Sequence, residues 1–253
     1  MKRGRAPSAI AGSAVAVATM AAAAQFAPSL ALSTAIGDRF APTLVGRGRL
    51  DHVALTFDDG PDPLGTPCLL RRLAELDVRA TFFLLGCQAT HAPDVVTEVV
   101  RAGHEVAVHG YHHRSMARRT PRATIDDIAR ARDTIAELAG VAPTYFRPPF
   151  GMLTLAALHG ARRAGLTTVL WTNWGRDWRP NATPVSIVDD VTRRPLAGAT
   201  VLLHDSDSQS APGSWRAVHD ALPQLAGAFA REQLTVGPLA AHGLRPTATE
   251  RAA

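Results

Sequence analysis

Short runs of apolar residues alternate along the chain with longer segments in which apolar residues recur at helical spacing. The short runs are rich in Val, Leu, Phe and Thr, which is typical of buried strands. They predict strands over residues 51–58, 80–85, 105–108, 167–171, 200–203 and 234–236. The longer segments predict helices over residues 67–76, 93–102, 121–139, 153–164, 185–193 and 215–231. Tyr145 and Phe146 lead into a segment with two prolines, Pro148 and Pro149, which preclude regular structure there.

Strands that alternate with helices in this way are typical of parallel β-α-β units in an α/β protein. Polar groups follow several different strands: Asp58 and Asp59, His109, Arg147, Asp177 and His204. Chemistry collected at the carboxyl ends of several parallel strands is typical of a barrel. An open doubly wound sheet is the alternative, but it normally gathers its ligand at one switch point. The pattern therefore favours a (β/α) barrel.

The length of 253 residues and a hydrophobic content of 46% indicate one large domain over residues 51–240, because no linker interrupts this stretch. The N-terminus differs, since three basic residues precede an uncharged run from Ala6 to Gly37. This indicates an export signal over residues 1–24, with an uncleaved membrane anchor as the alternative. Residues 25–50 form an N-terminal extension, and residues 241–253 a tail expected to fray from His242 onward. The protein is then secreted or associated with the cell wall.

The charge of the chain does not indicate nucleic-acid binding. Without residues 1–24 the chain carries 24 basic and 22 acidic residues, a net charge of +2 instead of +5. Its arginines are spread along the chain and not clustered with aromatic residues, so we expect no nucleic-acid partner. With only Cys68 and Cys87, a four-cysteine metal site is excluded, while a disulfide and two separate thiols both stay open. The oligomeric state is open as well.

A pair of acids and a pair of imidazoles predict a metal site. Asp58 and Asp59 end an alternating strand, and His109 and His113 lie four residues apart, so a helical turn or tight loop brings both imidazoles to one ion. Two histidines and one carboxylate suit Zn²⁺ with positions left open for water. His112 is an alternative ligand from the same segment. The remaining histidines of the central region are expected at the surface or at helix ends: His91, His104 and His159.

Five motifs occur in a fixed order: TFDDGP at residues 56–61, HGYHH at 109–113, RPPFG at 147–151, DW at 177–178 and LLHD at 202–205. Together they resemble the polysaccharide deacetylases with a NodB-homology domain, carbohydrate esterase family 4. The resemblance covers about residues 51–240. It implies a distorted (β/α) barrel with about seven strands and the hydrolysis of acetyl groups on a glycan.

The resemblance also implies a role for individual residues. The metal ligands would be Asp59, His109 and His113, with one divalent ion, Zn²⁺ first and Co²⁺ as the alternative. Asp58 would be the general base that deprotonates the activated water, and Arg147 would pair with it and favour its ionised form.

By the same resemblance His204 would be the general acid, and Asp177 would hold its tautomer and favour the imidazolium. Trp178 and Leu202 would wall the pocket for the acetyl methyl group, and the backbone N–H of Phe150 would help to stabilise an oxyanion.

Three positions depart from the family pattern: Gly110 stands in place of Ser or Thr, Phe150 in place of Tyr, and Trp174 in place of Asp. None of them removes a proposed ligand or an acid/base group. We therefore expect a secreted, metal-dependent deacetylase of an N-acetylated amino-sugar polysaccharide of the peptidoglycan or chitin type. The alternatives are an O-deacetylase of acetylated xylan-type glycans and a non-catalytic glycan-binding module.

Overall fold

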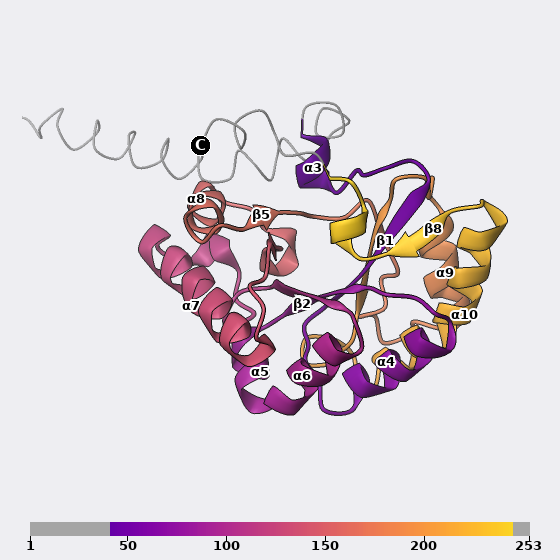
Figure 1. Cartoon of the computed structure of the whole chain (residues 1–253), viewed down its shortest axis with the longest axis horizontal. Helices are drawn as coiled ribbons and strands as arrows, with labels where there is room; N and C mark the ends of the chain where they lie inside the picture. Colours follow the sequence, from indigo (N-terminus) through magenta and orange to yellow (C-terminus); the bar gives the residue numbers. More distant parts are fainter. Residues whose placement is uncertain (1–40, 245–253) are drawn as a thin grey trace, which may run out of the picture.

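The strands of the structure pair in parallel, as the alternation of strands and helices predicts (Figure 1). The structure is a computed structural model and describes residues 41–244. Its strands are β1 His52–Asp58, β2 Thr81–Leu84, β3 Glu105–Val108, β4 Tyr145–Phe146, β5 Thr167–Thr168, β6 Asn173–Trp174, β7 Thr200–His204 and β8 Thr235–Gly237. Its α-helices are α3 Pro42–Val45, α4 Gly65–Glu75, α5 Gly86–His91, α6 Pro93–Arg101, α7 Pro121–Ala139, α8 Leu155–Arg163, α9 Pro184–Thr192 and α10 Trp215–Arg231.

The sheet curls into a barrel that is not closed by strand pairing. Its order is β5-β4-β3-β2-β1-β7-β6, and β8 pairs with β1. In a flat sheet the six steps from β5 to β6 would cover about 29 Å, because neighbouring strands lie about 4.8 Å apart. The chain between Thr168 and Asn173 reaches at most about 18 Å. The two ends of the sheet must therefore approach each other, which confirms the distorted barrel and excludes the open doubly wound sheet.

The gap between the two ends of the sheet is filled by the chain that precedes β1. The Leu170 N–H donates to the carbonyl oxygen of Leu44 at 2.8 Å, and the Thr200 hydroxyl donates to the carbonyl oxygen of Gly46 at 2.7 Å. Gly46 has a φ of 82°, and a Cβ there would lie 2.8 Å from the Thr200 hydroxyl oxygen, so the close approach requires glycine. Residues 42–46, expected to be part of an extension, complete the barrel wall.

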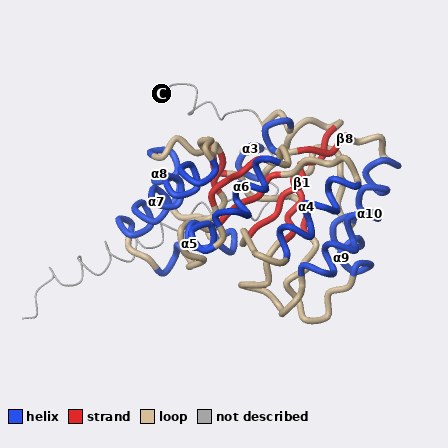
Figure 2. Tube along the Cα trace, turned by 60° about the horizontal axis from the view of Figure 1, so that its bottom comes forward, coloured by secondary structure: helices blue, strands red, loops and turns tan. Residues whose placement is uncertain are grey.

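The burial pattern of β1 explains why its last residue is available for chemistry. Val53, Leu55 and Phe57 belong to the large core between the sheet and the surrounding helices, which Figure 2 shows around the strands. The alternate residues face the barrel interior, where Ala54 joins a small apolar cluster. Asp58 follows on this interior face, at the carboxyl end of the strand.

Most predicted elements occur within two or three residues of their expected bounds, and the 19-residue helix α7 has the expected ones. The Thr120 hydroxyl caps its first turn by accepting from the Ala123 N–H, and Gly140 ends it with a φ of 67°. Three short elements were not expected, the helices α3 and α5 and the strand β6. The strand expected over residues 167–171 ends at Thr168, since the chain then crosses the gap of the barrel. Among residues 41–244 no helix is long and apolar enough to cross a membrane.

The structure decides one open question and corrects two expectations about histidines. Cys68 and Cys87 are separate free thiols and form no disulfide. His104 is buried, not at the surface, and its Nδ1 accepts from the Ala80 N–H at 3.1 Å. His242 is not frayed but fully buried, and its Nδ1 lies 2.9 Å from Nδ1 of His52. Residues 1–24, where the export signal is expected, lie outside the described residues, as do 245–253.

The buried pair His52–His242 predicts an acid-sensitive fold. Two facing ring nitrogens share a hydrogen bond only if one of them lacks a proton, and burial lowers the pKa of His52 and lowers that of His242 to about 4. An unfolded histidine titrates near pH 6.5, so the unfolded chain binds more protons between about pH 6.5 and 4 and stability falls as the pH falls through this window. We expect the melting temperature to drop over this range, and to drop less steeply in His242→Gln. The control His91→Gln changes an exposed ring and keeps the wild-type slope. Equal slopes in wild type and His242→Gln would contradict the assignment.

Candidate active site

The carboxyl ends of the strands surround a pocket of about 650 Å³. Several of the expected site residues line it: Asp58, Asp59, His109, His113, Phe150, Trp178, Leu202 and His204. Arg147 and Asp177 are fully buried behind this wall, each against one of the lining residues. The chain thus brings together groups from five segments of the barrel.

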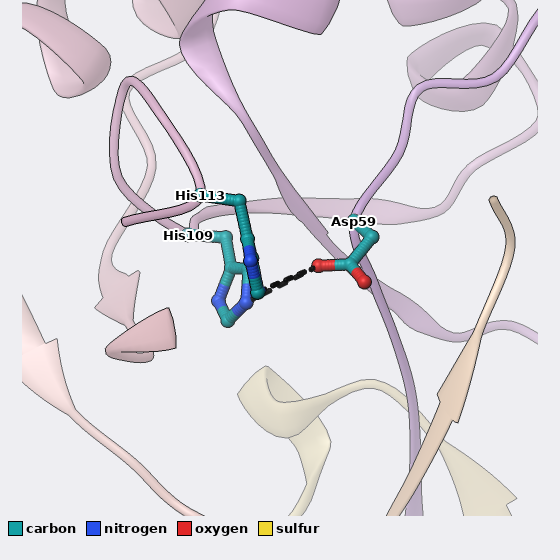
Figure 3. Close-up of side chains that lie close together, drawn as sticks. All are labelled: Asp59, His109 and His113. Atoms are coloured by element: carbon teal, nitrogen blue, oxygen red, sulfur yellow. Dashed lines mark ion pairs between the residues drawn. The ribbon is translucent and has the colours of Figure 1, made fainter. Parts of the chain in front are cut away.

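Asp59, His109 and His113 form a compact set of donor atoms (Figure 3). Oδ1 of Asp59 lies 3.4 Å from Nε2 of His109 and 3.3 Å from Nε2 of His113. Two donors bound to one ion at about 2.1 Å and at the tetrahedral angle would lie about 3.4 Å apart. Oδ1 of Asp59 is buried and accepts no hydrogen bond from the described residues. The three side chains therefore fit a single divalent ion.

The tautomer of His109 is set by the backbone of the next motif. Its Nδ1 lies 2.8 Å from the carbonyl oxygen of Arg147, which can only accept, so Nδ1 carries the proton and Nε2 offers its lone pair toward Asp59. Burial lowers the pKa of His109 well below the usual value and lowers that of His113 to about 4. Both imidazoles are therefore neutral near pH 7, as metal binding requires.

The loop that carries the two histidines is held by contacts that the motifs did not reveal. Gly110 has a φ of 93°, which explains glycine at this position of the loop. The Tyr111 N–H donates to Asp127 on α7 at 2.8 Å, and Arg119 pairs with the same carboxylate at 2.6 Å. Asp127 therefore ties the loop between the two histidines to α7. His112 does not join the donor set. Its ring packs against Tyr111 instead, edge to face, with 4.9 Å between the ring centroids.

Asp58 is paired with Arg147 inside the barrel. Nη1 of Arg147 donates to Oδ1 of Asp58 at 2.6 Å and to the Thr56 hydroxyl at 2.8 Å. Its Nε and Nη2 donate to the carbonyl oxygens of Val169 and Leu170 at 3.2 and 2.9 Å. Burial raises the pKa of Asp58, while Arg147 acts against this shift. The net pKa of Asp58 is raised, because burial outweighs the expected effect of Arg147. The second oxygen of Asp58 lies 3.8 Å from Nε2 of His109, beside the donor set.

His204 and Asp177 form a second pair at the pocket. Nδ1 of His204 lies 3.1 Å from both carboxylate oxygens of Asp177, which also accepts from the His204 backbone N–H at 2.8 Å. Burial alone would lower the pKa of His204, but Asp177 raises it to about 10, with smaller contributions from Asp59 and Asp58. Nε2 of His204 lies 3.9 Å from Oδ2 of Asp59. A charged imidazolium therefore lies beside the donor set.

The pocket wall contains more aromatic surface than the motifs indicated. The ring centroids of Phe150 and His113 lie 4.3 Å apart, and those of Trp178 and His204 lie 5.7 Å apart. Both pairs meet edge to face. Trp171, Trp174 and Arg176 line the pocket too, and no motif pointed to Trp171 or Arg176. A Cβ at Gly151 would lie 2.7 Å from the Trp171 ring, so the RPPFG turn needs its glycine for this approach.

Asp205, the last residue of the fifth motif, does not line the pocket. It is buried, its carboxylate accepts from the Thr66 hydroxyl at 2.5 Å, and burial raises its pKa to about 7. A Cβ at Gly60 would lie 2.2 Å from this carboxylate. Asp205 therefore supports the turn that follows Asp59, and Gly60 is needed to admit it.

The chain matches known proteins over most of this architecture. Residues 46–169 match the family described as polysaccharide deacetylase. The chain is 32% identical to a peptidoglycan-N-acetylglucosamine deacetylase of Bacillus cereus, over 74% of this chain and 68% of that protein. It is 38% identical to a chitooligosaccharide deacetylase of Bradyrhizobium sp., over 67% of this chain and 76% of that protein.

A solved structure shares the fold. It is that of a peptidoglycan N-acetylglucosamine deacetylase in complex with 4-naphthalen-1-yl-N-oxidanyl-benzamide, with a TM-score of 0.75 and 27% identity, over 85% of this chain and 99% of that one. The chain therefore belongs to the polysaccharide deacetylase family, the family 4 carbohydrate esterases, and is a hydrolase of this class.

The buried pair Asp58–Arg147 predicts a strong energetic coupling. Arg147→Met leaves the Asp58 carboxylate buried without its cation, which should lower the free energy of unfolding by about 3 kcal/mol or more. Asp58→Asn leaves the guanidinium in the same position without its anion. The double variant should lose less than the sum of the two, with a coupling of about 1 kcal/mol or more, measured by urea unfolding. Arg162→Met on the exposed surface of α8 is the control, and strictly additive losses would contradict the coupling.

Proposed function

We propose that this protein removes acetyl groups from an N-acetylated amino-sugar polysaccharide, with one divalent ion, Zn²⁺ first, held by Asp59, His109 and His113. The observation that carries the proposal is the donor set with spacings of 3.3 and 3.4 Å, placed between Asp58–Arg147 and His204–Asp177. The deacetylases among its relatives support the type of bond. Residues 1–24 begin with three basic residues and continue without charge, as export signals do. This supports action outside the cell membrane.

The ion, when bound, supplies a Lewis acid that polarises the acetyl carbonyl and lowers the pKa of a water molecule. Asp58 lies at the edge of the donor set and is the base that takes the proton of the attacking water. Arg147 holds the carboxylate in position and gives it a countercharge inside the barrel. The water oxygen bonds to the acetyl carbon, and the bond from this carbon to the sugar nitrogen breaks.

His204 provides the proton for the leaving nitrogen, so that a free amine and acetate are released. Asp177 keeps Nδ1 of His204 protonated, and the other ring nitrogen, Nε2, is then the atom that delivers its proton. The base lies beside His109 and the acid beside Asp59, and their neighbours give the two groups opposite charges. A glycan-binding module needs neither of these proton-transfer pairs, and this argues for catalysis.

Removal of a single proposed ligand predicts loss of metal binding. In isothermal titration with Zn²⁺ alone we expect one site in the wild-type protein and an affinity lower by about 100-fold or more in Asp59→Asn and His109→Gln. His112→Gln is the matched control, since this ring lies in the same loop but outside the donor set. Retained affinity in both ligand variants, or its loss in His112→Gln, would contradict the ligand assignment.

Replacement of the base separates catalysis from metal binding. We expect Asp58→Asn to bind Zn²⁺ but to release acetate from N-acetylated oligosaccharides at least about 1,000-fold more slowly than wild type, because no other described carboxylate stands free beside the donor set. Release is followed with and without added Zn²⁺, and on an acetylated xylan as well. Unchanged release by Asp58→Asn would falsify the base assignment. Release from the xylan ester alone would instead select the O-deacetylase.

A further inference from the structure

A cluster beside the pocket contains more arginines than acidic residues. It consists of Arg176, Arg179, Arg193 and Arg194 around Asp190 of α9. Nη2 of Arg179 lies 2.5 Å from one oxygen of Asp190, and Nη2 of Arg193 lies 3.1 Å from the other. Both carboxylate oxygens are therefore occupied. Within residues 41–244, Arg176 and Arg194 have no carboxylate partner.

The two arginines without a carboxylate partner stand against the same indole. The guanidinium carbon of Arg176 lies 5.3 Å from the Trp174 ring centroid, and that of Arg194 lies 4.9 Å from it. Contacts of this length between a guanidinium and an indole are attractive, and they hold the planar groups in place. The second anchor of Arg194 is a bond from its Nη1 to the carbonyl oxygen of Thr172 at 3.3 Å.

This cluster adjoins the reaction pocket directly. Trp174 and Arg176 line the pocket that holds Asp58 and His204, and they also line a small neighbouring hollow of about 70 Å³ with Arg193 and Arg194. Arg176 has a φ of 49°, a backbone conformation that favours glycine or asparagine, yet the position carries a long cationic side chain.

We infer that Arg176 and Arg194 form a carboxylate-binding subsite that selects an acidic N-acetylated glycan over a neutral one. Two planar guanidiniums beside one hollow match a carboxylate through paired N–H···O bonds, whereas a neutral chitin-type sugar offers them no anion. The inference rests on the proposed function and names its substrate class. The substrate is a polymer of the peptidoglycan type, in which a sugar next to the reacting acetamide carries a carboxyl group on an ether substituent.

The carboxylate has two sources in such a polymer, the ether substituent of the sugar and the peptide attached to it. Four oligosaccharides of equal length separate them: a neutral N-acetylglucosamine oligomer, a peptide-free glycan strand with free carboxylates, the same strand as its methyl ester, and a strand with peptides attached. The initial rate of acetate release by the Zn²⁺-loaded full chain gives kcat/KM for each. Binding of the same four oligomers to Asp58→Asn, measured by calorimetry, gives a readout that does not depend on turnover.

We expect wild type to prefer the free-carboxylate strand over its methyl ester by about 10-fold or more. Arg176→Gln and Arg194→Gln should each lower kcat/KM and binding for this strand by about 10-fold and change the neutral oligomer less than about 3-fold. Arg162→Gln on α8 removes the same charge far along the chain and keeps the wild-type preference. A preference only for the peptide-bearing strand, lost in the same variants, would assign the subsite to the peptide carboxylates.

Equal binding and turnover of the free acid and its methyl ester in wild type would overturn the subsite. So would a loss in Arg176→Gln that is the same for neutral and acidic oligomers. Failure of the proposed function shows differently, as absence of acetate from all four oligomers, and the binding preference in Asp58→Asn still decides the subsite in that case.

Discussion

The contact on which the site and the barrel both depend is the buried guanidinium of Arg147. It is fully excluded from solvent, and its donors join the end of β1 to the carbonyl oxygens of Val169 and Leu170. A charge in such a place is tolerated only when it is paired and its hydrogen bonds are satisfied. Asp58 supplies the charge, the Thr56 hydroxyl and the two carbonyls supply the remaining acceptors, and the Phe83 ring covers the cation at 4.0 Å. The base is therefore positioned by the same side chain that crosses the barrel interior.

The parallel arrangement of the strands makes the rest of the site follow from local features. The strands bring residues at or just after their carboxyl ends to the same end of the barrel, so residues far apart in sequence meet without long connections. The metal donors come from the turns after β1 and β3, and the acid pair from the region of β6 and β7. The positions of the charges then create opposed environments, since Arg147 faces the base and Asp177 faces the acid. Burial strengthens the attraction within both pairs because little water remains to screen it, while the loss of hydration itself works against each charge.

The sequence allowed the barrel and the grouping of the site residues to be predicted, but not the contacts that support them. The motifs are local and lie at or near strand ends, so the topology was enough to expect one of the two aspartates beside two of the histidines. The family resemblance then selected Asp59, His109 and His113. Asp127 was missed because it lies on a helix with no motif around it, and its effect on the histidine loop is visible only in three dimensions. Strand β6 was missed because two residues give no periodicity. The burial of His104 and His242 was missed because each depends on a partner distant in sequence.

The gap in the barrel has a mechanical consequence. Residues 169–172 bridge the two ends of the sheet, and the carbonyl groups that receive Arg147 belong to this bridge. The adjoining Leu170 N–H is in turn tied to Leu44, in the stretch that leads into β1. The same set of hydrogen bonds thus orients Asp58 and keeps the barrel wall continuous. A change that loosens the bridge, even one remote from the pocket mouth, reorients the carboxylate as well, so rigidity of the wall and competence of the base rise and fall together.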